Sequence, residues 1–417
     1  MDFQHFTVRL QAYIQRKWNE GVISLATQLL RQATQSILWL ALLPLTVALH
    51  LAGFRRLTVL TPRIGHLAIE VDTFLKRRAL GEIPSRRYFI TSPKATTSNA
   101  WLLRYWSAYL PIVTHPSLCF VLEALSRWKL LRYDLSDYVL RLNKTALAYS
   151  VATAWSNRPP LLALTDDDER WGQAQLTQLG VPDGAWFVAF HVREGGFSPA
   201  DESVHRHRNT SVENMLPAVR RIVALGGYCI RMGDPTMTPL LREKGIVDYA
   251  HHPSRSSRLD VYLCAKTRFF LGNSSGLAFV ASAFGVPSAL ANMTPFSNLG
   301  LLPCDLSIPK LLWSEELGRF LRFDEGLSSE VSNYRYAALF DQAGISPVEN
   351  SAEDIADLVL DMLRLLDRQE ICILEDQLQQ KVFAQLLKPG HYSHGTSAKI
   401  SASFLRNHTN LLSPLSK

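Results

Sequence analysis

The chain has 417 residues, of which 19% are charged and 47% hydrophobic. This length exceeds what one ordinary hydrophobic core supports, so two globular units are expected. The composition excludes a disordered, collagen-like or coiled-coil protein. Five scattered cysteines without a C-x-x-C pair give neither a disulfide framework nor a zinc knuckle, and they suit a reducing cytosol.

The net charge is +7, and its distribution matters more than its size. Residues 1–104 carry 14 Lys and Arg against 5 Asp and Glu, so the rest of the chain is slightly acidic. A cation excess at one end argues against a nucleic-acid partner and for an N-terminal portion that faces an anionic surface. A membrane leaflet of anionic lipids attracts Lys and Arg at roughly 1 kcal/mol each.

The stretch from Ser36 to Phe54 contains no formal charge and is flanked by arginines. Its length matches the roughly 17–25 residues of a spanning helix, whereas Pro44 and His50 disfavour an uninterrupted helix in hydrocarbon. Residues 3–17 have the pattern of an amphipathic interfacial helix. Three interpretations stay open: a single span, a hairpin or in-plane anchor, and a buried core helix. Either of the first two would place the protein on the cytoplasmic face of the inner membrane, as a peripheral or single-anchor protein.

Beyond residue 55, short apolar runs alternate with longer amphipathic stretches and tight glycine turns, which predicts a parallel, doubly wound α/β sheet. Strands are expected at residues 57–61, 88–91, 112–115, 186–192, 228–232, 268–271 and 288–291. Helices are expected through Phe74 and Arg78 and at residues 101–109, 212–225, 260–266, 276–284 and 351–366.

The expected organisation has four parts. Residues 1–54 form membrane-associating helices, and residues 346–417 form C-terminal helices that pack back on the domains. Between them, residues 55–180 and 181–345 form two Rossmann-like domains that face a cleft.

The first segment whose residues could bind a ligand is H-V-R-E-G-G, directly after an expected strand. Ligands of open α/β sheets bind at the carboxyl ends of strands, and alternation puts His191 and Arg193 on the same side of the backbone. An arginine fork makes paired hydrogen bonds to a diphosphate, and Gly195 and Gly196 would let backbone amides approach an anion. The alternative is a solvated loop with a histidine at the strand end.

The second segment is the basic cluster His205–Asn209, which includes Arg208. Ser211 is expected to cap the following helix, whose N-terminus is itself an anion site. The alternative is a solvated, charged face.

The third segment, Arg231 to Asp234, ends an expected strand and contains Gly233. An arginine inside an apolar strand needs a partner if it is buried. Asp234 and a ligand phosphate are the two alternatives.

The fourth segment, Asn273-Ser274-Ser275-Gly276, joins a strand to a helix. Small hydroxyl side chains and free N–H groups at a helix N-terminus suit a phosphate, although no Walker A lysine follows. The alternative is a simple helix cap.

In the first domain, Gly65-His66 follows a strand and opens a helix. His66 could act as a general base at neutral pH, with Glu70 and Asp72 as alternatives. The other interpretation is a cap or surface histidine. A D-x-D occurs at Asp166–Asp168, but its polar surroundings favour a solvated linker, so no metal site is expected.

Together the segments H-V-R-E-G-G, H-R-N, R-M-G-D and L-G-N-S-S-G, with S-F-L-R-N-H near the C-terminus, resemble a family of bacterial glycosyltransferases of the GT-B class. The His191-x-Arg193 element is similar to the diphosphate motif of GDP-fucose-dependent fucosyltransferases, which often carry a second arginine where this chain has Glu194. The resemblance implies that Arg193 contacts the donor diphosphate and that the turn Ser274–Gly276 lies against the sugar nucleotide. The R-I-G-H-L-A segment resembles a loop of membrane-associated GT-B enzymes in which the histidine lies near a lipid-linked acceptor.

The expected function is therefore a metal-independent glycosyltransferase without a cofactor. It would use a nucleotide-diphosphate sugar, held by residues 181–345, and a cell-envelope glycan or lipid-linked acceptor, held by residues 55–180. The expected donor-binding residues are His191, Arg193, Gly195, Gly196, Arg208, Asn209, Arg231, Gly233, Asp234, Asn273, Ser274, Ser275 and Gly276, and the expected catalytic residues are His66, Glu70 and Asp72. The alternative is a non-catalytic nucleotide- or phosphate-binding α/β protein associated with envelope polysaccharide assembly. A dehydrogenase would need a G-x-G-x-x-G turn, which the sequence lacks.

Overall fold

The computed structural model describes residues 22–412, except 128, 140, 142–143, 156–157, 198 and 370–372. The chain divides into two compact units, Met1–Val139 and Leu140–Lys417. Each unit holds a parallel sheet with helices, so the predicted α/β class with parallel sheets is confirmed. The amphipathic helix expected at residues 3–17 lies outside the described residues.

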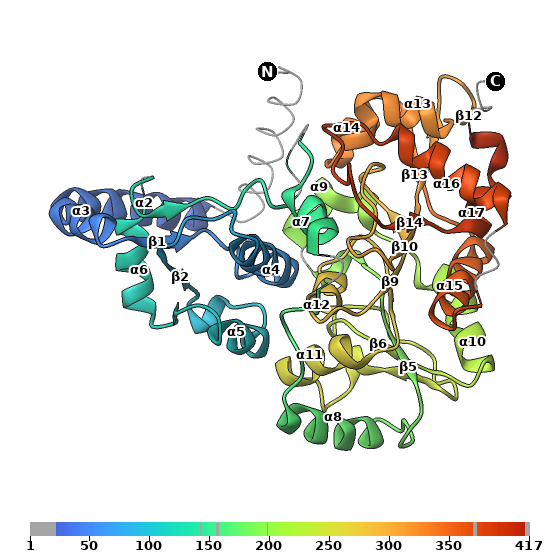
Figure 1. Ribbon diagram of the computed structural model, residues 1–417, viewed down its shortest axis with the longest axis horizontal. Coiled ribbons are helices and arrows are strands. Elements are labelled where there is room, and N and C mark those ends of the chain that lie inside the picture. The colour runs from blue at the N-terminus through green and yellow to red at the C-terminus, as the bar shows by residue number, and fades with distance from the viewer. Residues whose placement is uncertain are drawn as a thin grey trace. The chain divides into compact units, whose positions relative to one another are not determined.

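The first unit is a small α/β layer (Figure 1). Its helices are α2 (Val22–Ala41), α3 (Leu43–Leu51), α4 (Ile64–Ala79), α5 (Ala100–Ser107) and α6 (Pro116–Leu125), and its strands are β1 (Phe54–Leu57), β2 (Arg87–Thr91), β3 (Ile112–Val113) and β4 (Arg132–Tyr133). The strand order is β3-β2-β1-β4, and every pair is parallel. Helix α4 packs on this sheet through Phe74, whose ring meets those of Tyr88 and Tyr133 edge to face at 4.8 and 5.5 Å.

The second unit contains a larger parallel sheet and a small antiparallel one. Its helices are α7 (Leu147–Trp155), α8 (Asp166–Gln178), α9 (Pro199–His205), α10 (Val212–Ala224), α11 (Ser257–Lys266), α12 (Leu277–Ala283), α13 (Phe323–Ser328), α14 (Ala337–Gln342), α15 (Ala352–Leu366), α16 (Leu374–Leu386) and α17 (Ala402–Asn407). Its strands are β5 (Phe187–His191), β6 (Tyr228–Arg231), β7 (Ile246–Asp248), β8 (Phe270–Gly272), β9 (Ser288–Met293), β10 (Leu306–Pro309), β11 (Leu311–Ser314), β12 (Arg319–Phe320), β13 (Ile345–Val348) and β14 (Lys399–Ile400).

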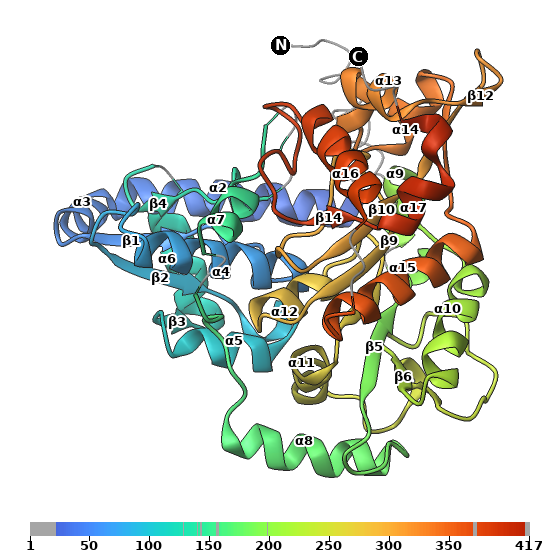
Figure 2. The ribbon, with the colours of Figure 1, turned by 45° about the vertical axis from the view of Figure 1, so that its right-hand side comes forward.

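The larger sheet has the order β14-β10-β9-β8-β5-β6-β7, and all its strands run parallel. Helices α10 and α15 cover one face and α11 and α12 the other (Figure 2). Strand β5 is buried except at its end, because its residues Phe187–Phe190 face helices on both sides. The chain moves outward from β5 to β6 and β7 and then crosses to β8 on the other side of β5. This reversal is the feature of doubly wound sheets that creates a ligand site.

The boundary between the units differs from the expected one. Residues 140–180 belong to the second unit rather than to the first. Helix α8 packs on α11, where Arg258 forms ion pairs with Asp167 and Asp168. The Asp166–Asp168 run is therefore the first turn of α8, capped by Thr165, and its interpretation as a solvated linker was wrong.

The first strand was expected at residues 57–61, but β1 lies earlier in the chain, at Phe54–Leu57. β1 ends at Leu57, and the backbone N–H of Leu60 already donates to Glu70 of α4 at 3.0 Å. The segment that follows β1 therefore serves as a loop at the carboxyl end of the sheet.

The N-terminal apolar stretch forms two helices. Among the described residues, no single helix combines the length and the apolar composition of a membrane span, whereas α2 and α3 meet these criteria as a pair bent by 70°. Pro44 lies in the first turn of α3, immediately after the bend.

Gly172 sets how closely α8 approaches α11. An ideal Cβ at this position would lie 2.1 Å from Cδ2 of the buried Tyr262 ring. We therefore expect Gly172→Ala to lower the free energy of unfolding by about 1–2 kcal/mol, because the overpacking cost exceeds the gain in helix propensity. Chemical denaturation measures this change. Gln178→Ala, on an exposed position of the same helix, should stay within about 0.5 kcal/mol of wild type. A Gly172→Ala protein as stable as wild type would contradict the contact.

Candidate functional site

The carboxyl ends of β5 and β8 lie side by side at the point where the strand order reverses. His191, the last residue of β5, pairs with Gly272, the last residue of β8. The loops that leave these strands carry the first, second and fourth sequence segments. Ligands of open α/β sheets bind at such a switch point, so the fold places these three segments where a ligand is expected.

The Asn273 side chain joins the loops at this point. Its Oδ1 accepts from the backbone N–H of Arg193 at 3.2 Å, and its Nδ2 donates to Oγ1 of Thr210 at 3.1 Å and to the Arg208 carbonyl at 3.4 Å. The side chain is 1% exposed, so these bonds form out of reach of water. Asn273 therefore holds the loop after β5 and the basic cluster against the loop after β8.

Arg193 and Arg208 contact the same group of loops. Nη1 of Arg193 donates to Oδ1 of Asn209 and, at 3.4 Å, to the His205 carbonyl. Nη2 of Arg208 donates to the Ser274 carbonyl at 2.6 Å. Both side chains are half-buried. The structure thus brings two of the predicted arginines to the switch point.

Two further charged groups, Lys310 and Glu202, support this cluster, and the sequence did not single them out. Lys310, which is 4% exposed, donates from Nζ to the Asn209 carbonyl at 2.7 Å. Burial lowers its pKa, and the Glu349 carboxylate opposes that shift. Glu202 accepts from Nδ2 of Asn209. A lysine inside the apolar run 306–313 was a usable signal, whereas nothing in the sequence distinguished Glu202.

Polar atoms without partners cluster near the same strand ends. Within the described part of the chain, Nδ1 of His191, Oγ of Ser275 and Oγ1 of Thr294 are buried and have no hydrogen-bond partner. Thr294 lies next to the loop after β8, because its carbonyl accepts from Oγ of Ser274 at 2.8 Å. Buried polar atoms are almost always satisfied in proteins, so a bound polar ligand would explain this group.

The predicted glycines have packing roles. An ideal Cβ on Gly195 would lie 2.8 Å from the Glu202 carboxyl carbon, and one on Gly196 would lie 2.8 Å from the Thr236 carbonyl oxygen. Gly233 has φ +148°, and its Cβ would lie 2.0 Å from Sδ of Met237. The missing Cβ atoms at Gly195 and Gly196 therefore leave room for Glu202 and Thr236.

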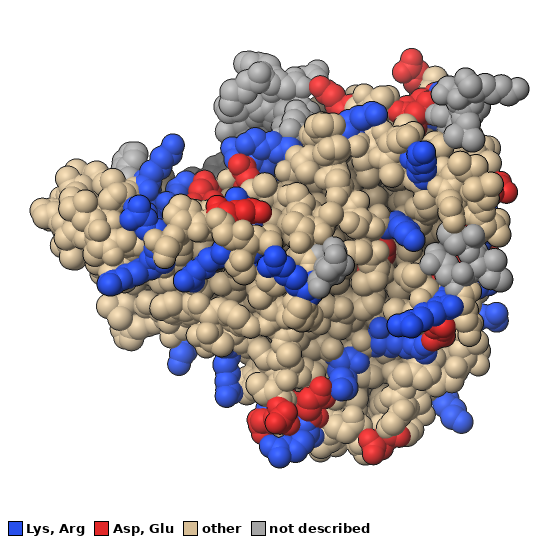
Figure 3. Space-filling model, viewed as in Figure 1, with Lys and Arg blue, Asp and Glu red and all other residues tan. Residues whose placement is uncertain are grey.

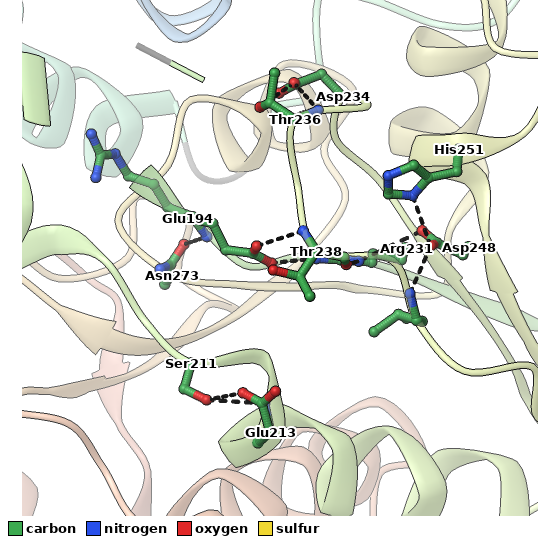
Figure 4. A network of polar contacts seen from close by, with 12 residues as sticks. Glu194, Ser211, Glu213, Arg231, Asp234, Thr236, Thr238, Asp248, His251 and Asn273 are labelled. Atoms are coloured by element: carbon green, nitrogen blue, oxygen red, sulfur yellow. Dashed lines mark hydrogen bonds and ion pairs between the residues drawn. The ribbon is translucent and has the colours of Figure 1, made fainter. Parts of the chain in front are cut away.

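Arg231 and Asp234 depart from the expectation (Figure 4). The Arg231 side chain is 0% exposed, pairs with Glu194 and lies 3.7 Å from Oδ1 of Asp248. Asp234 instead accepts from N and Oγ1 of Thr236, at 2.9 and 2.6 Å. Asp234 as the partner of Arg231 was wrong. The guanidinium group is enclosed by protein carboxylates, so its geometry does not support a donor contact.

Gly276 precedes a short helix. Helix α12 has seven residues, and no side chain caps it. The helix dipole at this expected anion site is therefore weak. The hydroxyl groups of Ser274 and Ser275 are the stronger candidates for contact with an anion. In contrast, the predicted cap at Ser211 is confirmed, because its Oγ accepts from the Glu213 N–H.

Two histidines near the cations are held neutral. Burial lowers the pKa of His191 to about 4, with Arg231 as the next cause. Burial also lowers the pKa of His207 to about 2, and His205, Arg208 and Lys310 add to the shift. Positive charge is therefore concentrated here on arginine and lysine.

The first unit contains a separate polar group at its own switch point, between β1 and β4. Nδ1 of His66 lies 2.7 Å from Oε1 of Glu70, whose Oε2 accepts from the Leu60 N–H at 3.0 Å. The His66 side chain is 37% exposed, whereas that of Glu70 is 5% exposed. The carboxylate fixes one imidazole nitrogen and leaves Nε2 as the outward one.

Asp72 lies apart from this pair. Its carboxylate is buried and accepts from Nζ of Lys76 at 2.6 Å within α4. Burial raises its pKa, and Lys76 opposes that shift. A buried, ion-paired carboxylate is a structural element of α4, so the geometry favours His66 and Glu70 over Asp72.

Across the residues that the structure describes, no group of three or more His, Cys, Asp and Glu side chains is arranged to hold a metal ion. The D-x-D carboxylates Asp167 and Asp168 are engaged by Arg258.

Comparisons with known proteins add solved structures of low similarity. No protein-family model and no curated protein matches the chain. A family 9 glycosyltransferase from Veillonella parvula matches at 12% identity and TM-score 0.37, over 73% of this chain and 79% of its own. The ADP-heptose LPS heptosyltransferase II of E. coli matches at 12% identity and TM-score 0.38, over 57% and 84%. The iron-containing dodecameric glycosyltransferase TibC of enterotoxigenic E. coli matches at 13% identity and TM-score 0.33, over 59% and 58%. TM-scores this low do not establish a shared fold or function.

The depressed pKa of His207 makes stability depend on pH. The unfolded chain binds a proton near pH 6.5 and the native state does not, so the free energy of unfolding falls as pH falls below about 6.5. From pH 6.5 to 5 this one group should cost about 2 kcal/mol. We expect His207→Phe, whose ring can pack on Phe340, to be near neutral at pH 7 and to remove that loss at pH 5.

Denaturation curves at pH 7 and pH 5 measure this difference. His115→Gln, which replaces an exposed histidine of the first unit, is the control and should leave the pH dependence unchanged. Equal losses in wild type and His207→Phe would contradict the assignment.

Proposed function

We propose that the chain is a metal-independent glycosyltransferase of the GT-B class that transfers a sugar from a nucleotide-diphosphate sugar to a cell-envelope glycan or lipid-linked acceptor. The observation that carries this proposal is the convergence of Arg193 and Arg208 on the loops at the switch point of the second sheet. A diphosphate leaving group needs compensating positive charge, and arginine supplies it with paired, charge-assisted hydrogen bonds.

In this proposal, the donor binds the second unit with its diphosphate against Arg193 and Arg208. The buried hydroxyls of Ser275 and Thr294 and Nδ1 of His191 would bond to polar atoms of the donor. Asn273 bonds to the Arg193 backbone, and Lys310 bonds to the Asn209 carbonyl. Because these contacts fix the loops, the cations would be in place before the diphosphate departs. Such preorganised charge typically contributes several kcal/mol to transition-state stabilisation.

The proposed chemistry is attack of an acceptor hydroxyl oxygen on the anomeric carbon of the donor sugar. The bond between that carbon and the diphosphate oxygen breaks, and nucleoside diphosphate leaves with the bonding electrons. Nε2 of His66 takes the hydroxyl proton, while Glu70 holds the ring through Nδ1. His66 is the proposed general base, and Glu70 is a positioning residue.

Donor binding can be tested without knowing the acceptor. We expect ADP-, GDP- or UDP-sugars to raise the melting temperature of the full chain in EDTA, and Arg193→Ala or Arg208→Ala to abolish that rise. Nucleoside diphosphate release should fall about 100-fold or more in either variant. Arg206→Ala is the matched control, because Arg206 lies in the same cluster but pairs with Asp341 at 2.6 Å. Stabilisation by NAD(P) alone would overturn the proposal.

The base can be separated from the donor site. We expect His66→Gln to retain the donor-induced rise in melting temperature but to release nucleoside diphosphate about 100-fold or more slowly, because only the proton acceptor is lost. Glu70→Gln should have a smaller effect on the rate. His115→Gln, an exposed histidine in the same unit, should behave as wild type. Donor binding without turnover in wild type, with envelope extract as acceptor, would favour a non-catalytic nucleotide-binding protein instead.

A further inference from the structure

Large hydrophobic side chains are exposed on three helices of the first unit. Leu30 is 69% exposed and Leu51 is 77% exposed. The full set, called here the apolar helix surface, is Leu29, Leu30, Ile37 and Leu40 on α2, Leu45, Val47 and Leu51 on α3, and Leu118 on α6. Soluble surfaces seldom gather so many large apolar groups, so this surface marks an interaction site.

These helices form one body within the unit (Figures 1 and 2). Helix α2 packs on α6, where Arg31 pairs with Glu123 at 2.6 Å and its guanidinium lies 5.8 Å from the Phe120 ring centroid. Residues 32–54 contain no Lys, Arg, Asp or Glu. The surface over α3 in Figure 3 is accordingly free of charged side chains.

The bend between α2 and α3 decides how this surface could meet a membrane. The uncharged part of α2, residues 32–41, is about 15 Å long and α3 about 14 Å, whereas a bilayer core is about 30 Å thick. Since the two helices are bent by 70°, neither reaches across. Their lengths fit one leaflet.

A basic rim adjoins the end of α3. Nη1 of Arg55 donates to the His50 carbonyl at 3.1 Å, and a Cβ on Gly53 would lie 3.8 Å from Cδ of Arg86. Arg87 pairs with Phe54 across the sheet, and its guanidinium lies 5.3 Å from that ring.

Lys129 completes this rim, because Nδ1 of His50 contacts the carbonyl of the next residue, Leu130, at 2.5 Å. Arg132 adds less charge, since Asp134 lies 3.4 Å from it. We use "basic rim" for Arg55, Arg86, Arg87 and Lys129.

We propose that the apolar helix surface and the basic rim dock the first unit on one leaflet of an anionic lipid bilayer, with α2 and α3 in the interface rather than across it. Apolar burial and attraction of Lys and Arg to anionic headgroups act together at such sites. A second copy of the chain fits less well, because an isologous interface presents the same surface from both sides and offers no negative charge to the basic rim. This proposal does not rest on the transferase assignment.

Vesicle co-sedimentation of the full chain, without any donor, tests the docking. We expect binding to vesicles of phosphatidylcholine with phosphatidylglycerol, weaker binding to phosphatidylcholine alone, and loss of the difference at high salt. L45Q/L51Q should weaken binding to both kinds of vesicle at least tenfold, whereas R86Q/K129Q should weaken binding at least tenfold only to the anionic ones.

Matched control variants distinguish binding through the apolar helix surface and the basic rim from non-specific adsorption to vesicles. L225Q/L241Q and R242Q/K244Q change equally exposed leucines and cations of the second unit and should bind as wild type. Circular dichroism melting checks that each variant folds. Wild type that ignores anionic vesicles, or L45Q/L51Q that binds them as wild type does, would overturn the proposal. So would a wild-type dimer, without vesicle binding, that L45Q/L51Q converts to monomer.

Discussion

The Asn273 carboxamide is the interaction on which the proposed donor site depends. One buried side chain bonds to the backbone of Arg193, the backbone of Arg208 and the hydroxyl of Thr210. A buried amide that loses such partners is destabilising, so the three segments are fixed together rather than brought together by a ligand. Loops that leave adjacent strands become one preorganised surface, which carries two cations of the connection between β5 and α10.

Charge compensation explains why the second unit can concentrate cations. Arg231 is the last residue of β6, and its side chain is fully buried. An uncompensated charge there would be strongly destabilising, and the Glu194 carboxylate pairs with it. Arg193 donates to the Asn209 side-chain oxygen, and Arg208 donates to the Ser274 carbonyl.

Local patterns predicted much of the fold and part of the site. The apolar runs of β5 and β6 and the capped helices α10 and α15 could be predicted from the sequence, because burial patterns and helix caps depend on residues that are close together in the chain. The unit boundary was not, since it depends on contacts such as Arg258 with Asp168, which lie far apart in sequence. For the same reason the partner of Arg231 was missed, because Glu194 lies in the loop after the neighbouring strand β5 and far from Arg231 in sequence. The position of Arg193 just after a strand and that of His66 at the start of a helix could be predicted from local pattern, whereas the contact of Lys310 with Asn209 is tertiary.

Electrostatics also favours a division of roles between the two sheets. Both have the order 3-2-1-4 around their first strand, and both carry histidine near its carboxyl end. In the second unit, burial and nearby cations hold the pKa of His191 at about 4, which makes it a weak proton acceptor. The same positive charge that would stabilise a departing diphosphate therefore disfavours a general base beside it. The proposed base, His66, has the carboxylate of Glu70 at its ring instead of a cation.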